Sequence, residues 1–82
     1  MIITVQLYPP LKFPGGTERR QLSEVPDGLT IGGLLNKLEA GGTFGGYGQQ
    51  AVFAIVENDV AVNDYILKAG QTVKILLLIA GG

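Results

Sequence analysis

Two glycines at the end of the sequence are the residues best suited to chemistry. Gly81 and Gly82 carry a carboxylate on a narrow stem without side chains, and such a stem can enter a tight active site. The largely apolar run 73–79 is typical of a strand, so the stem is predicted to project from a rigid body. We expect a tail whose carboxylate is loaded chemically by another protein. An ordinary frayed terminus is the alternative.

The side chains offer little for catalysis by the chain alone. The 82 residues include neither cysteine nor histidine. This excludes disulfides, thiolate nucleophiles, Ser-His and Cys-His couples and the usual transition-metal ligands. Asp59 and Asp64 lie near predicted turns, where carboxylates are usually solvated, so we assign them no metal or acid–base role. We expect a protein that is not an enzyme by itself and binds no cofactor or metal.

Charge and hydropathy limit the partners. Six basic and seven acidic residues give a net charge of -1, and Arg19-Arg20 is the only adjacent basic pair, so nucleic acid is not an expected partner. No apolar stretch approaches membrane-spanning length, and residues 2–5 read as a strand rather than a signal segment. We expect a cytoplasmic protein that contacts no membrane, with residues 1–82 forming one domain.

Period-two patterns predict a sheet. Ile3, Val5 and Leu7 alternate with polar residues, and the turn signal Pro14-Gly15-Gly16 predicts a hairpin with a polar edge strand at 18–24. Further segments with strand character follow at 51–57, 60–62 and 73–79, and the first of these is predicted to be well buried.

One helix is predicted. Thr30 can cap it, and its apolar residues fall at helical spacing: Ile31, Leu34, Leu35 and Leu38. A single short helix covers only one face of a sheet, so we predict an α+β fold with a mixed sheet and one open face. The glycine-rich segment 41–48 is predicted to be a mobile loop without packing side chains.

Several blocks of sequence together resemble the MoaD/ThiS family of sulfur carriers, most of all the branch of the small molybdopterin synthase subunit. The blocks are Val5-Gln6-Leu7-Tyr8 with Leu11, Leu29-Thr30-Ile31 with Leu34-Leu35 and Leu38, the run 67–75, and Ile79-Ala80-Gly81-Gly82. The resemblance spans essentially the whole chain and implies a ubiquitin-like β-grasp. The sequence departs from the family at Glu57-Asn58-Asp59, where members often carry an Asn-Gly turn.

The resemblance also implies a reaction at the tail. An E1-like adenylating enzyme would use ATP and Mg²⁺ to turn the Gly82 carboxylate into an acyl-adenylate. A sulfur donor protein would then convert it to a thiocarboxylate, which delivers sulfur to a pterin precursor on a large synthase subunit. Gly81 would let the tail thread into the active site. Thiazole synthesis for thiamine, protein modification and a non-catalytic interaction module stay open as alternatives.

Two further features bear on binding. The strand phase set by Lys74 predicts that Tyr8, Leu76 and Leu78 face outward as an apolar patch for a partner, continued by Ile79 and Ala80.

The segment 46–51 matches a relaxed G-x-G-x-x-A pattern. It follows the predicted helix and precedes a strand, the reverse of the context that nucleotide binding requires, so we predict a surface loop.

Overall fold

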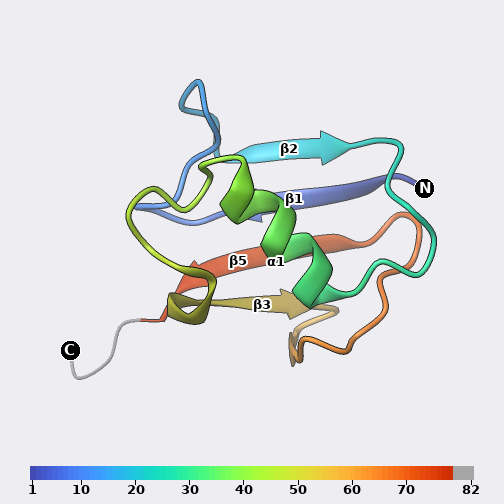
Figure 1. The fold of residues 1–82 in the computed structure, drawn as a ribbon. Coiled ribbons are helices and arrows are strands. Elements are labelled where there is room, and N and C mark those ends of the chain that lie inside the picture. The colour runs from blue at the N-terminus through green and yellow to red at the C-terminus, as the bar shows by residue number, and fades with distance from the viewer. Residues whose placement is uncertain (79–82) are drawn as a thin grey trace.

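The computed structural model, which describes residues 1–78, is a five-stranded sheet with one α-helix across one face (Figure 1). The elements in chain order are β1 (Ile3–Leu7), β2 (Arg19–Leu22), α1 (Ile31–Ala40), the 3₁₀ turn η1 (Gln49–Ala51), β3 (Val52–Val56), β4 (Asp59–Ala61) and β5 (Thr72–Leu77). This is the predicted order, and the strands after β1 are trimmed or shifted by one to a few residues. None of the described residues forms a helix long and apolar enough to cross a membrane.

The sheet is mixed, as predicted. Its strand order is β2-β1-β5-β3-β4. The central pair β1 and β5 is parallel, with Val5 opposite Val73, and every other pair is antiparallel. The chain between β1 and β5 forms a crossover that carries α1, which is the connection that a parallel pair needs.

Helix α1 begins where the sequence predicts. The Thr30 hydroxyl accepts a hydrogen bond from the Gly33 N–H at 3.1 Å, and the four predicted apolar residues of α1 are buried. Gly32 allows a close contact, because a Cβ at this position would lie 3.3 Å from the Asn63 Cβ. Gly32, at a cost in helix propensity, therefore lets the segment after β4 pack against the first turn, whereas a Cβ at Gly33 would lie 2.8 Å from the Leu29 Cδ1.

The core lies between α1 and the sheet. The inward residues of the central strands are fully buried: Ile3, Val5, Leu7, Val73 and Ile75. Leu11, Phe13 and Leu67 reach the same core from outside the regular elements. The core is thus closed at its ends by side chains from the loops.

The prediction that segment 41–48 lacks packing side chains is wrong. Thr43 and Phe44 are buried, and Phe44 is only 2% exposed. The Thr43 N–H donates to the Leu38 carbonyl at 3.0 Å, and the Tyr47 N–H donates to the Phe44 carbonyl at 3.0 Å. One aromatic ring therefore anchors the glycine-rich segment, because its burial removes a large apolar area from water.

Phe44→Ala should lower the free energy of unfolding by about 3–5 kcal/mol, because it empties a core position. Tyr47→Ala is the matched control in the same segment, since Tyr47 is 45% exposed and its removal should cost little. Urea denaturation of both variants measures the difference. Equal stabilities would show that the segment contributes nothing to the core.

The β3–β4 hairpin turns through Glu57 and Asn58, which have φ values of 56° and 71°. Positive φ at both positions is typical of a type I′ turn, which favours Asn and Gly.

Asn58→Val should lower the free energy of unfolding by about 1–2 kcal/mol, because a β-branched residue is strained in this region. Asn58→Gly should retain the wild-type stability or exceed it. Thermal unfolding of both variants tests the turn type, and equal losses would contradict it.

Candidate functional site

The base of the tail is the end of the central strand β5. At this end the Leu78 N–H donates to the Ala51 carbonyl at 2.7 Å. Strand β5 pairs with β1 as far as Ile75 and with β3 as far as Leu77, so two neighbouring strands hold the strand that leads to the tail. The predicted site residues Ile79, Ala80, Gly81 and Gly82 lie outside the described residues.

The face of the sheet opposite α1 carries an apolar area beside this base. Leu76 is half-buried and stands directly opposite Phe53 of β3. Tyr8 continues the line of β1, and its N–H donates to the Ile75 carbonyl at 3.1 Å, which places it next to Leu76. Tyr8 is 36% and Leu78 58% exposed. The predicted outward positions of Tyr8, Leu76 and Leu78 are therefore observed.

Sequence reasoning missed two members of this area. Phe53 and Ile55 are half-buried, whereas Val52, Ala54 and Val56 are buried toward the helix. Strand β3 is therefore buried on one face only, and the prediction of a well-buried strand is half right. The sequence feature that indicates these outward apolar residues is an unbroken apolar run in a strand of a sheet with one open face. We call Tyr8, Phe53, Ile55, Leu76 and Leu78 the open-face patch.

Polar side chains limit the patch on the side of β2. Lys74 lies between Gln6 of β1 and Ile55 of β3 in the strand register. Gln6 accepts a hydrogen bond from the Arg19 guanidinium at 3.1 Å. The open face is therefore apolar near the end of β5 and polar toward the β2 edge, so its apolar part adjoins the base of the tail.

The glycine pattern at 46–51 leads into β3 through the single 3₁₀ turn η1 rather than into an α-helix. Gln49 is tied to α1, because its backbone N–H donates to a Glu39 carboxylate oxygen at 2.9 Å. This segment has the order of elements that the sequence predicted, helix before and strand after.

A comparison with protein families bears directly on this arrangement. The ThiS family model matches residues 12–82, which includes α1, β5 and the terminal glycines. The chain belongs to the ThiS family. The predicted MoaD/ThiS resemblance is therefore confirmed. No curated protein sequence matches this ThiS-family chain.

Solved structures share the fold of this ThiS-family protein. SAMP1 from Haloferax volcanii superposes with a TM-score of 0.76 over 100% of both chains at 16% identity. A second crystal structure of H. volcanii small archaeal modifier protein 1 gives 0.74 at 14% identity, covering 95% of this chain and 98% of that one. A Pyrococcus furiosus protein assigned as molybdopterin converting factor subunit 1 gives 0.73 at 18% identity, covering 96% and 99%. The ubiquitin-like β-grasp is confirmed, in the form shared by sulfur carriers and ubiquitin-like modifiers.

Proposed function

We propose that this chain is a sulfur carrier whose Gly82 carboxylate is adenylated and converted to a thiocarboxylate. The supporting observation is the ThiS family match, which extends through Gly81 and Gly82 and includes every element from β2 to β5. The chain has no cysteine. Transferred sulfur would therefore be held by the terminal carbonyl carbon rather than by a side chain.

The proposed reaction needs activation, because a carboxylate is a poor acyl donor. The Gly82 carboxylate attacks the α-phosphorus of ATP on an E1-like adenylating enzyme with Mg²⁺, and pyrophosphate leaves. The terminal sulfur of a persulfide on the donor protein then displaces AMP, and a thiol reduces the resulting acyl disulfide to release the thiocarboxylate. Gly81 contributes by having no Cβ, which suits a close-walled channel.

The open-face patch is the proposed docking surface for these partners. It is apolar and contiguous across β1, β5 and β3, and contiguous exposed apolar surface is typical of interaction sites. Its position beside the base of the tail would bring a bound partner next to Ile79 and Ala80, which we propose continue the contact. The E1-like enzyme and a large synthase subunit would then use the same face in turn.

We propose molybdopterin or tungstopterin biosynthesis as the pathway, supported by the fold shared with a protein assigned as molybdopterin converting factor subunit 1. Thiazole synthesis for thiamine is the alternative suggested by the family name. Conjugation to proteins is a second candidate, because SAMP1 has the same fold and is named a modifier. Three incubations of the loaded carrier distinguish these functions. The first contains a pterin precursor and a large subunit, the second a thiazole-forming system, and the third lysine-bearing proteins.

Loading should raise the intact mass by about 16 Da, the difference between sulfur and oxygen, when the chain is incubated with an adenylating enzyme, ATP and a persulfide donor. Deleting Gly82 should abolish loading, because the acyl centre moves by a whole residue, and a displacement of about 1 Å already costs about 10²-fold in rate. Gly81→Val should slow loading by steric obstruction.

C-terminal fragmentation separates sulfur at Gly82 from oxidation of Met1, which adds a similar mass. Thermal unfolding of both tail variants should match the wild type, because we expect the tail to make no contribution to the core. If the unmodified chain forms neither an adenylate nor a thiocarboxylate under these conditions, it is not a sulfur carrier.

Leu76→Glu should weaken binding to the adenylating enzyme by at least about tenfold, since it places a charge at the centre of an interface that must lose water. Ile66→Glu is the matched control. Ile66 is 57% exposed and pairs with Thr30 at the start of α1, outside the open-face patch, so the same change there should leave affinity intact. Calorimetric titration measures both variants, and equal affinities would exclude the open-face patch from recognition.

A further inference from the structure

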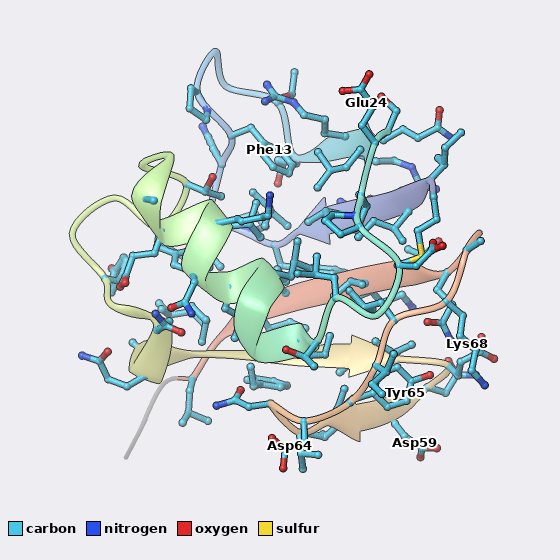
Figure 2. All side chains as sticks on the ribbon, turned by 45° about the vertical axis from the view of Figure 1, so that its right-hand side comes forward. Phe13, Glu24, Asp59, Asp64, Tyr65 and Lys68 are labelled. Carbon is cyan, nitrogen blue, oxygen red and sulfur yellow. The ribbon has the colours of Figure 1, made fainter. Side chains whose placement is uncertain are left out.

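A second surface lies on the helix side of the sheet, between β2 and α1. It is a groove of about 330 Å³. Its apolar lining comes from Phe13, Leu22, Val25, Leu34 and Leu38. Figure 2 shows Phe13 and Glu24 on the β2 side of the helix, well away from Lys68. The groove is on the opposite side of the sheet from the open-face patch.

One wall of the groove is an unpaired strand edge. Within residues 1–78, β2 pairs with β1 alone. The Leu7 N–H donates to the Glu18 carbonyl at 2.6 Å, so the alternation of an antiparallel pair directs the backbone groups of Arg20 and Leu22 toward β1. The N–H and C=O groups of Arg19 and Gln21 then point outward. This edge can accept another strand.

Positive charge is concentrated at one end of the groove. Arg20 and Lys37 both line it. The Arg20 guanidinium lies 4.6 Å from the centre of the Phe13 ring and donates to the Pro14 carbonyl at 3.2 Å, and neither partner is negatively charged. Glu24 lines the groove beyond the other end of β2. A ligand with one acidic end is therefore complementary to this groove.

We propose that the groove binds an extended peptide segment of another protein, added as a strand to the β2 edge. Its backbone would pair with Arg19 and Gln21. Alternate side chains would enter the apolar groove, since residues two apart on a strand project from the same face. Acidic residues at one end of the segment would lie beside Arg20 and Lys37. A helical ligand fits less well, because its backbone is already paired and cannot satisfy the edge.

This inference does not depend on the proposed sulfur chemistry. The groove uses neither the tail nor the open-face patch. A peptide bound there would leave both free, so recruitment of such a peptide and loading of the tail are compatible on one molecule.

Two synthetic peptides test the proposal, acetyl-Asp-Asp-Glu-Val-Ile-Val-Leu-amide and acetyl-Val-Ile-Val-Leu-Asp-Asp-Glu-amide, because a strand can add in either direction. Amide chemical shifts of the labelled full chain should change along β2 and α1 with at least one of them, with Kd below about 1 mM. Replacing the acidic residues with lysine should abolish binding.

Three variants localise the contact. Arg20→Glu and Lys37→Glu should each raise Kd by at least about tenfold, whereas Lys68→Glu, the same change on a remote loop, should not. Gln21→Pro removes an outward N–H without changing the groove lining, and it should also raise Kd. Arg20, Gln21 and Lys37 are exposed, so these variants should keep the dispersed spectrum of the folded chain.

The proposal is overturned if neither acidic peptide binds, if the lysine peptides bind equally well, or if the shift changes map to Phe53 and Leu76 on the open face. It is also overturned if Gln21→Pro binds with wild-type affinity, because the peptide would then make no use of the strand edge.

Discussion

The parallel pairing of β1 with β5 is the constraint on which the rest of the structure depends. It places the first and last strands side by side at the centre of the sheet, with Val5 opposite Val73 and both fully buried. Parallel neighbours cannot be joined by a tight turn, so the chain between them must cross over, and α1 is part of that crossover. The same pairing makes the last strand a central one, which gives the tail a firmly held base.

A single helix over five strands makes the two sides of the sheet unlike. The helix side is filled by the core, and grooves remain along α1, one toward the edge strand β2 and one toward β3. Within residues 1–78 no helix covers the other side, and its composition changes from polar near Gln6 to apolar near Leu76. Two surfaces with different chemistry therefore exist on opposite sides of one thin layer, and the chain can use them independently.

The sequence predicts the elements well where one face is buried and the other is polar. The spacing of apolar residues is visible in β1, at Ile3, Val5 and Leu7, and among the leucines of α1. Polar residues or glycines separate the apolar positions there. The uniformly apolar β3 has no such contrast, so the outward side chains of Phe53 and Ile55 were missed. Phe44 was missed because its glycine neighbours dominate the local composition. The groove depends on loop residues such as Phe13 that meet α1 only in the folded chain.

The first turn of α1 has a consequence for phosphate binding. The free N–H groups and positive dipole end of a helix ordinarily form an anion site. In this chain the Ile31 and Gly32 N–H groups donate to the carbonyls of Tyr65 and Asn63 at 2.9 and 3.0 Å, while the Gly33 and Leu34 N–H groups bond to Thr30. All four N–H groups of the first turn are paired within the chain. A phosphate group would therefore find no free backbone N–H in the first turn of α1.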